Sequence, residues 1–384
     1  MQQQDRAISI LGAWPERLLT GSIAQDWHLV EKEIAARKSE TPDDGMPRGF
    51  LGGWIDYESQ FCLGIYEHTL VFDHADESWH GSPRLAAARR ENFSPQWKPV
   101  EFQPHTPRND FLHMVRTARE YIAAGDIYQV NLSQQFSAEF SGDAWAYYER
   151  LRSISPAPYS AWLDLGERQV LSTSPECFLQ MSGRHIRTRP IKGTRPRFAA
   201  SDADEKSAYD LLTSPKEIAE LVMITDLERN DLGQVCDFGS VRVSELLKME
   251  RYEQVFHLVS TVEGHLRDGI TQAAALAACF PGGSITGAPK KRAREIIAEL
   301  EPDARGLYTG ALGFFGFNGE SRFNIAIRTV IHEQGRLHFR VGAGIVADSD
   351  PEREYEETLH KAQGLLLAAG RGLHAGAGQI SLKR

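Results

Sequence analysis

The feature that most constrains the fold is a series of apolar, strand-like segments joined by very short turns. Arg322–His332 and Arg336–Val341 are separated by a link built on Gln334-Gly335. Asn318-Gly319 joins Gly310–Phe317 to the first of these in the same way. Such turns connect neighbouring antiparallel strands, whereas parallel strands need a crossover of about a dozen residues or more. The chain therefore favours antiparallel sheets.

The rest of the chain mixes similar strands with helices. Further strands are expected at Ile127–Phe136, Tyr159–Leu165, Gln169–Ser172 and Phe178–Met181. Apolar periodicity and capping residues predict helices at Ala24–Lys38, Asp110–Ala124, Ser214–Leu227, Thr271–Ala278, Pro289–Leu300 and Pro351–Ala369. Hairpin strands without strict strand–helix alternation predict an α+β fold with outer helices.

The length of 384 residues is enough for a large core with a deep pocket. Residues 1–104 are less regular and are interpreted as a variable N-terminal lobe that belongs to the same overall fold. The catalytic domain is predicted at 105–375, and 376–384 is interpreted as a C-terminal tail.

Composition excludes several classes of function. The net charge of −9 offers no basic surface for nucleic acid or an anionic membrane. The longest apolar stretch, near Ala273–Phe280, is too short to span a bilayer, and Met1–Ile10 lacks the features of a signal peptide. The four cysteines are scattered, so they are expected to be reduced and buried. A soluble, cytoplasmic protein is predicted.

Two glycine-rich segments resemble phosphate-binding motifs only superficially. In Gly282–Lys290, Ala288-Pro289 stands where a P-loop needs lysine and a hydroxyl residue. Gly342–Ala347 has the spacing of a dinucleotide-binding turn but no second strand or ribose-binding acid follows it. Both segments are instead expected to present free backbone N–H groups to a carboxylate or phosphate.

Two pairs of glutamates share one spacing on separate predicted helices. Glu217 and Glu220 form one pair, and Glu354 and Glu357 form the other. Residues three apart lie on one helix face, so two such faces together would offer an all-oxygen site for Mg²⁺. Spacing alone favours the simpler interpretation of solvated helix faces, with Ser214 and Glu217 forming a capping box.

Four single residues stand out for their chemistry. Lys192 lies between Ile191 and Gly193 and is either a nucleophile or a surface charge in a turn. Glu176 is either a general acid or a glutamate at a helix start. His257, flanked by apolar residues, is most simply a core histidine. Arg328 lies in an apolar strand and needs an anion, which points to an acidic substrate.

Together these segments resemble the chorismate-utilising enzyme family, over about Arg108 to Arg371. The resemblance rests on motifs that occur in one order: 125–134 (GDIYQVNLSQ), 174–176 (SPE), 190–194 (PIKGT), 220–231 (ELVMITDLERND), 287–290 (GAPK), 308–311 (YTGA), 327–329 (IRT) and 342–346 (GAGIV). The resemblance implies an anthranilate-synthase-like, two-sheet antiparallel β-sandwich flanked by helices. This fold agrees with the α+β prediction made from the hairpins.

Within the family, the residue at position 192 distinguishes two branches. Anthranilate synthases have alanine there, whereas aminodeoxychorismate synthases have lysine. Lys192 and the Asn131–Gln134 run therefore imply the branch that leads to p-aminobenzoate and folate. In that chemistry Lys192 adds to C2 of chorismate as the C4 hydroxyl leaves, Glu176 supplies the proton, and ammonia then replaces the lysine at the ring.

The resemblance also implies the remaining site residues. Mg²⁺ would be held by Glu220 and Glu357, with Glu217 and Glu354 beside them. The enolpyruvyl carboxylate would be bound by a further set of residues: Ser284, Tyr308, Arg328, Gly342, Ala343 and Gly344. Thr194 follows the nucleophile in the same motif, and His257 would support the pocket or move a proton.

No residues resemble a glutamine-hydrolysing site, so ammonia is expected from a glutamine amidotransferase subunit. Three alternatives remain open at this point: an anthranilate synthase component I, a non-catalytic chorismate-binding subunit and a phosphate-binding transferase. Regulation by bound tryptophan is in doubt because the upstream segment that builds its pocket is not found. No lyase domain is found, so the product is expected to be 4-amino-4-deoxychorismate.

Overall fold

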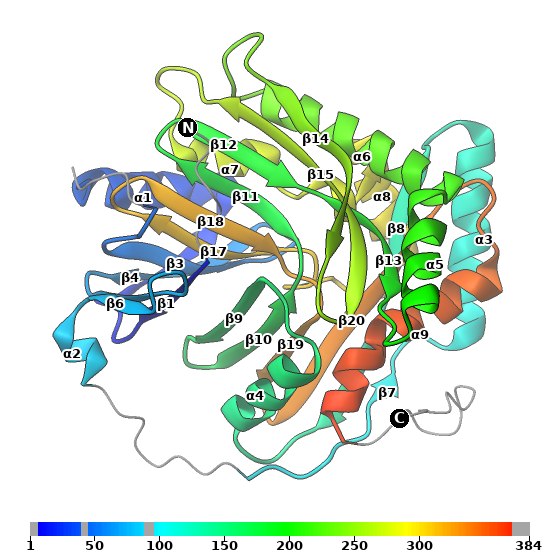
Figure 1. Cartoon of the computed structure of the whole chain (residues 1–384), viewed down its shortest axis with the longest axis horizontal. Helices are drawn as coiled ribbons and strands as arrows, with labels where there is room; N and C mark the ends of the chain where they lie inside the picture. The colour runs from blue at the N-terminus through cyan, green and yellow to red at the C-terminus, as the bar shows by residue number, and fades with distance from the viewer. Residues whose placement is uncertain (1–6, 40–44, 88–95, 371–384) are drawn as a thin grey trace.

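The computed structural model describes residues 7–39, 45–87 and 96–370 (Figure 1). The tail predicted at 376–384 lies outside the described residues. Within the described residues, every strand pairing between named strands is antiparallel, and the strands form two large sheets and one small sheet. Helices flank the sheets (Figure 1), which confirms the predicted α+β class.

The larger sheet brings N-terminal and central strands together. Its spatial order is β13 (Ile191–Pro196), β15 (Val255–His265), β12 (His185–Arg189), β11 (Cys177–Ser182), β18 (Glu320–Ile325), β17 (Ala311–Gly316), β3 (Phe50–Ile55), β4 (Gln60–Tyr66) and β2 (Leu18–Ser22), with β14 (Arg242–Arg251) paired to β15. Strand β3 of the N-terminal region pairs directly with β17. The first hundred residues thus contribute strands to the same sheet as the later chain.

The second large sheet contains the glycine-rich C-terminal strand. Its order is β16 (Gly287–Ala288), β8 (Gln129–Glu139), β20 (Arg336–Ile345), β19 (Thr329–Glu333), β10 (Arg168–Ser174) and β9 (Tyr159–Asp164), and β7 (Gln103–Pro104) also pairs with β8. The small sheet consists of β1 (Ile8–Gly12), β5 (Thr69–Asp73) and β6 (Ser78–Gly81).

The helices have recognisable start and stop signals. Their bounds are α1 (Ile23–Ala36), α2 (Pro83–Ala86), α3 (Arg108–Ala124), α4 (Ala144–Ile154), α5 (Ser201–Leu212), α6 (Pro215–Gly233), α7 (Gln272–Cys279), α8 (Lys290–Leu300) and α9 (Pro351–Ala368). The Ser214 hydroxyl accepts a hydrogen bond from the Glu217 amide at the start of α6, and Asp350 caps α9. Gly125 ends α3 in the left-handed conformation that glycine adopts readily.

The two faces of strand β8 have different roles. Val130, Leu132 and Phe136 point into the main hydrophobic core, where Phe136 stacks on Phe339 of β20. Since side chains alternate along a strand, Gln129 and Asn131 face the opposite way. They lie on the same face as Gly344 and Gly342 of β20. The core therefore holds β8 in place while its polar face remains available for a site.

The prediction of one continuous strand at Arg322–His332 is wrong, because β18 ends at Ile325 and β19 begins at Thr329. The chain leaves the larger sheet at β18 and enters the second sheet at β19. Arg328 lies at this crossing with a positive φ of 48°, and its carbonyl accepts a hydrogen bond from Thr173 N. The change of sheet requires the break, which apolar periodicity does not reveal.

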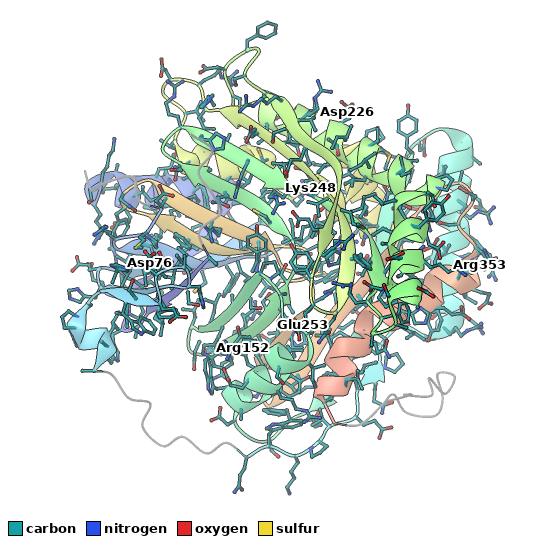
Figure 2. The ribbon with its side chains drawn as sticks, viewed as in Figure 1. Asp76, Arg152, Asp226, Lys248, Glu253 and Arg353 are labelled. Atoms are coloured by element: carbon teal, nitrogen blue, oxygen red, sulfur yellow. The ribbon has the colours of Figure 1, made fainter. Side chains whose placement is uncertain are left out.

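Charged side chains of α6 and α9 separate into outer and inner faces. Asp226 and Arg353 are exposed on the outside of the molecule (Figure 2), whereas Glu220 and Glu354 on the same helices are buried. All four cysteines are buried and free, as expected. Among the helices of the described residues, none combines the length and the apolar character that crossing a bilayer would require.

Candidate functional site

The predicted catalytic side chains converge on one edge of the larger sheet. Lys192 and Thr194 lie on β13, His257 lies opposite them on β15, and Glu176 directly precedes β11. Lys192 pairs with Leu258 and Thr194 with His257 across this ladder. The site is thus built on paired strands, which hold its groups more rigidly than a loop would.

Lys192 points toward the turn that contains Ser284. Its Nζ donates a hydrogen bond to the Ser284 carbonyl, with a distance of 3.3 Å. The Lys192 ammonium also acts on the carboxyl groups of Glu176, Glu220 and Glu357, where its charge opposes the rise in pKa caused by burial. The lysine is therefore surrounded by the acidic groups of the site and does not project into solvent.

Glu176 is buried, with 5% of its surface exposed. Burial raises the pKa of its carboxyl group, while a hydrogen bond from the Ser284 side chain and the charge of Lys192 act in the opposite direction. The net effect is a raised pKa. A buried carboxyl group whose protonated form is favoured is suited to donate a proton to a leaving oxygen.

His257 is held in its neutral form. Burial and the nearby positive charge of Arg328 lower the pKa of its imidazole to about 4. Its Nδ1 lies 3.0 Å from the Thr194 hydroxyl and 3.5 Å from the Gly193 carbonyl. Thr194 therefore fixes the ring, and at neutral pH His257 can form hydrogen bonds but carries no charge.

The buried guanidinium of Arg328 needs an anion as its partner. Burial lowers the pKa of its guanidinium and the charge of Glu176 partly opposes this. No hydrogen bond or ion pair to this guanidinium is found among residues 7–39, 45–87 and 96–370. A partly buried guanidinium without a partner is costly, so a bound anion at this position is strongly favoured.

Helices α6 and α9 bring the two glutamate pairs to the same end of the site. Lys216 lies between them, with its Nζ 3.3 Å from Glu354 and 4.0 Å from Glu220. Glu354 also accepts a hydrogen bond of 2.7 Å from Ser349. Glu217 faces Arg195 at 3.8 Å. The pairs are therefore neighbours in space, as the family resemblance implied, whereas their spacing alone had favoured separate solvated faces.

The glutamates retain capacity for a cation. Glu220 Oε1 and Glu354 Oε2 are buried without a hydrogen-bond partner. Such oxygens fit a hard divalent cation, which takes oxygen ligands. In the described part of the chain, no group of three or more potential ligands is already gathered around one point.

The glycine-rich segment at 342–344, which was expected to present free backbone N–H groups, lies inside β20. Gly342 pairs with Ser133 of β8, and Gly344 pairs with Asn131. Neither pair exchanges backbone hydrogen bonds, since the Ser133 amide donates to Glu301 and the Asn131 amide donates to Thr286. The backbone groups of the two glycines thus point away from β8, whereas those of Ala343 point toward it. Gly342 and Gly344 can still offer N–H groups to a ligand.

Lys361 is a site residue that the sequence interpretation missed. Its Nζ donates to the Gly342 carbonyl at 3.0 Å and lies 2.7 Å from Glu357. Partial desolvation lowers the pKa of this ammonium, but the attraction of Glu357 outweighs it and the net pKa is raised. Its position four residues after Glu357 was the only available signal, and such pairs are common on solvated helix faces.

Tyr308 is also close to this segment. A Cβ added to Gly342 would lie 2.7 Å from the Tyr308 hydroxyl. Burial raises the pKa of this phenol. Tyr308 also lines a cavity of about 380 Å³. This cavity is rich in arginine and histidine side chains and extends along β20 from Arg340 to Arg336.

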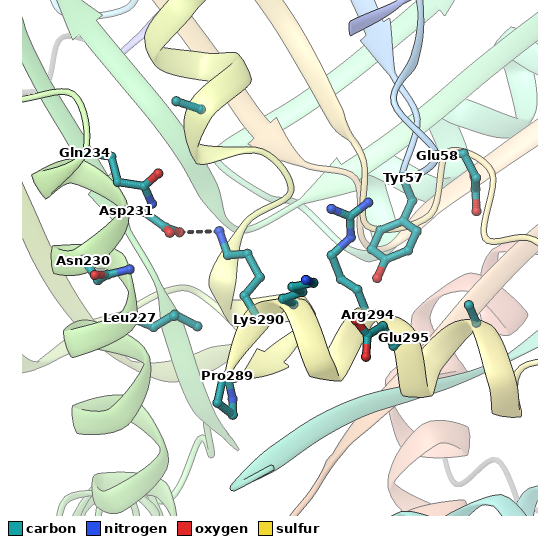
Figure 3. A pocket seen from close by; sticks show the side chains of 13 residues that line it. Tyr57, Glu58, Leu227, Asn230, Asp231, Gln234, Pro289, Lys290, Arg294 and Glu295 are labelled. Atoms are coloured by element: carbon teal, nitrogen blue, oxygen red, sulfur yellow. Dashed lines mark hydrogen bonds and ion pairs between the residues drawn. The ribbon is translucent and has the colours of Figure 1, made fainter. Parts of the chain in front are cut away.

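The larger cavity, of about 790 Å³, lies elsewhere (Figure 3). It is lined by the end of α6 and by α8, and Figure 3 shows the ion pair between Asp231 and Lys290 across it. Lys192, Glu176 and His257 do not line it. Leu227 lines this cavity and also lies against Gly283. The Gly283 amide donates to Glu228, so it is not free for a ligand.

The sequence also matches a family model described as chorismate binding enzyme, over residues 29–367. The chain belongs to the chorismate-binding enzyme family. Among curated relatives, anthranilate synthase component 1 1 of Haloarcula marismortui is 47% identical over 299 residues, which cover 77% of this chain and 61% of that protein. Aminodeoxychorismate synthase component 1 of Salmonella typhimurium is 43% identical over 314 residues, which cover 79% and 69%.

The solved structures agree with this assignment. A crystal structure of anthranilate synthase component I from Streptococcus pneumoniae superposes with a TM-score of 0.82 at 30% identity and covers 94% of this chain and 93% of that one. The chain spans about three fifths of the length of several anthranilate synthase relatives that it matches, from 55% to 61%.

Proposed function

We propose that this chorismate-binding enzyme is an aminodeoxychorismate synthase component I, which converts chorismate and ammonia to 4-amino-4-deoxychorismate. The observation that carries the proposal is the position of Lys192. Its amine lies among Glu176, Glu220 and Glu357, within the site and next to the Ser284 turn. A lysine placed there can reach a bound ring, and it stands where anthranilate synthases have alanine.

The reaction divides one difficult substitution into two allylic steps. After the Lys192 ammonium releases a proton to water, its neutral amine forms a bond to C2, the ring double bonds shift, and the C4 hydroxyl leaves as water with the proton of Glu176. Ammonia then forms a bond to C4, the double bonds shift back, and Lys192 leaves C2 as a neutral amine. The proton released from the new C4 ammonium returns to Glu176. The sum is chorismate plus ammonia giving the amino product plus water.

The other side chains bind and orient the substrate. Arg328 is positioned to pair with the enolpyruvyl carboxylate, and the N–H groups of Gly342 and Gly344 and the Tyr308 hydroxyl would supply hydrogen bonds. Neutral His257, fixed by Thr194, would contact the ring without adding charge. Glu220 and Glu357, with Glu217 and Glu354 beside them, would hold Mg²⁺, which neutralises the charge of the ring carboxylate when bound.

Two further points belong to the proposal. Ammonia would be supplied by a glutamine amidotransferase partner, and free ammonium should replace that partner in vitro. The second candidate function is anthranilate synthase component I, because identities to such relatives reach 47% and 50%, above the 43% and 41% to aminodeoxychorismate synthases. Lys192 argues against it.

Product analysis separates the two candidates. The purified protein is incubated with chorismate, Mg²⁺ and ammonium, with and without an added aminodeoxychorismate lyase. The proposal predicts p-aminobenzoate only when the lyase is present. Anthranilate together with pyruvate would assign the protein to the second candidate. Absence of any turnover would favour a non-catalytic chorismate-binding subunit.

A further inference from the structure

The cavity of about 380 Å³ beside Tyr308 has more positive than negative side chains in its wall. Strands β8 and β20 line it on the same face as Gly342, toward the start of β20. Neither Arg328 nor any of the catalytic side chains described above lines it. The cavity is therefore distinct from the position of the reacting ring. Its charged lining residues are four arginines and one glutamate: Arg168, Arg305, Arg336, Arg340 and Glu333.

Two of these arginines already have an anionic partner inside the protein. Arg305 and Arg340 are 4% and 3% exposed, and both form ion pairs with Glu301. Most of their other donors are taken by nearby carbonyl and hydroxyl oxygens. These two guanidinium groups therefore form a fixed part of the wall.

The other two arginines keep donors that no neighbouring side chain uses. Arg168 donates from Nε to Glu333 at 2.9 Å, and Arg336 donates from one Nη to Ser137 at 3.2 Å. Arg336 also lies 3.3 Å from the exposed Glu139. In the described part of the chain, both Nη groups of Arg168 and the second Nη of Arg336 have no hydrogen-bond partner. Two guanidinium groups thus retain unused N–H donors at one cavity.

The imidazoles of the cavity add to its donors. His105 lies 2.6 Å from the Ser137 hydroxyl, and His338 lies 3.5 Å from Glu333. Burial lowers the pKa of the His338 imidazole, and positive neighbours such as Arg168 lower it further, while Glu333 opposes both. Among the described residues that line the cavity, Glu333 is the only carboxylate. Negative charge is thus scarce where donors are plentiful.

Two residues of the wall connect the cavity to the chorismate site. Tyr308 lines the cavity, and its hydroxyl lies 2.7 Å from the place that a Cβ on Gly342 would take. Thr329 also lines it and directly follows Arg328, which is positioned to pair with the substrate carboxylate. An anion in the cavity and chorismate in its own site would add negative charge to neighbouring cations. Each should therefore lower the affinity for the other, and by the same factor.

Guanidinium groups bind the oxygens of carboxylates and phosphates through paired N–H donors. A volume of about 380 Å³ suits a small molecule. We infer that this cavity is a second ligand site, which binds a small dianion with carboxylate or phosphate groups and thereby weakens the binding of chorismate. Arg168 and Arg336 hold the anion, and His105 and His338 are further donors. Such a site goes beyond the proposed function, because it lets an anionic metabolite regulate the enzyme.

The test uses inorganic phosphate and succinate as probes, one for each class of oxyanion. Each is titrated into the intact chain at constant ionic strength, balanced with sodium chloride, while NMR follows the His338 imidazole. We expect saturable binding and a rise in the pKa of His338, because a bound anion favours the protonated imidazole. The His338→Gln variant identifies the signal. The probe with the lower Kd identifies the class of oxyanion.

Two arginine variants and one matched control locate the probe. Arg168→Met and Arg336→Met should each raise the Kd about tenfold or more, since each removes a charged hydrogen-bond donor. Arg242→Met is the control. Arg242 faces Glu263 across β14 and β15, in the same kind of cross-strand pair that Arg168 makes across β10 and β19. The two Nε–carboxylate distances are 2.8 and 2.9 Å. Arg242→Met should leave the Kd within about twofold of wild type.

Removing the carboxylate of the cavity should instead increase affinity. In Glu333→Gln, the Kd for the probe should fall about two- to fivefold, because the anion no longer competes with Glu333 for Arg168. A gain in affinity cannot result from misfolding. This variant therefore tests the site even where an arginine variant is unstable.

Calorimetry of chorismate binding, at fixed free Mg²⁺ and without ammonium, measures the coupling between the sites. Phosphate should raise the Kd for chorismate about fivefold or more and then, once its own site is saturated, have no further effect. Chorismate should raise the Kd for phosphate by the same factor. Because binding alone is measured, a failure of the proposed amination would leave this result unaffected.

Several results would overturn the inference. Neither probe saturates, or the Kd is unchanged in both arginine variants. An equal loss of affinity in Arg242→Met would indicate a non-specific attraction of anions. A Kd for chorismate that ignores the probe would exclude a regulatory role. A Kd for chorismate that rises without limit as phosphate is added would place phosphate in the chorismate site.

Discussion

Replacing Arg305 with methionine tests how the polar interior holds the site in position. Arg305 is 4% exposed and donates to both oxygens of Glu301, at 2.7 and 3.0 Å. It also donates to the carbonyls of Asn131 and Ile285, at 2.6 and 3.1 Å. One guanidinium thus joins α8, strand β8 and the Ser284 turn.

The expected loss is large because the substitution leaves a buried charge behind. Removing one partner of a buried ion pair costs about 3–5 kcal/mol. Glu301 retains a contact of 3.2 Å with Arg340 and two hydrogen bonds from Ser133, so the lower half of this range is expected. We therefore predict a decrease of about 3 kcal/mol in the free energy of unfolding for Arg305→Met.

Urea denaturation followed by tryptophan fluorescence measures this value. Arg336→Met is the control, because Arg336 pairs with Glu139 at 3.3 Å on the surface, where such pairs contribute about 1 kcal/mol or less. A loss below about 1 kcal/mol for Arg305→Met, or equal losses for both variants, would refute the reasoning. Arg305→Met should also lower amination, since it releases the backbone of Asn131.

Three further predictions concern the site. Glu176→Gln, which keeps the shape but cannot donate a proton from a carboxyl group, should lower kcat about 10²–10⁴-fold with little change in the KM for chorismate, and a kcat within threefold of wild type would contradict the assignment. The pKa of the His257 imidazole is lowered to about 4, so the folded state disfavours its protonation. Its contribution to the free energy of unfolding, at most about 3 kcal/mol, should be complete above pH 6.5 and be lost as the pH falls toward 4. The urea midpoint of His257→Gln should therefore depend less on acid pH than that of the wild type. Glu357→Gln should weaken Mg²⁺ binding at least tenfold in calorimetry with chorismate absent, and equal affinities would exclude Glu357 as a ligand.

The sequence was most informative where local rules and the fold agree. Hairpin turns predicted the antiparallel sheets, and capping by Ser214 and Gly125 placed helix ends within a few residues. The spacing of the glutamate pairs alone favoured solvated helix faces, and only the family resemblance implied that α6 and α9 meet at a metal site. The position of Lys216 between the two pairs could not be predicted, because contacts between distant helices leave no periodic signal in the sequence.

The break between β18 and β19 could not be predicted for a related reason. Apolar residues continue through Ala326 and Ile327, so periodicity indicates one strand, and only the tertiary path sends the chain to another sheet. Arg328 was recognised as an arginine that needs an anion, but its positive φ was not foreseen. Gln129 and Asn131 were noted only as members of a motif, because the sequence does not show that their buried side-chain oxygens lack hydrogen-bond partners.

The central claim is that Lys192 forms a covalent bond to the substrate ring. The most direct measurement is peptide mass analysis after mixing the enzyme with chorismate and Mg²⁺, without ammonia, and quenching rapidly in acid. The account predicts that the peptide containing Lys192 gains the mass of one chorismate less one water, and that Lys192→Ala gives no such species and little amination. Amination by Lys192→Ala at the wild-type rate would contradict it.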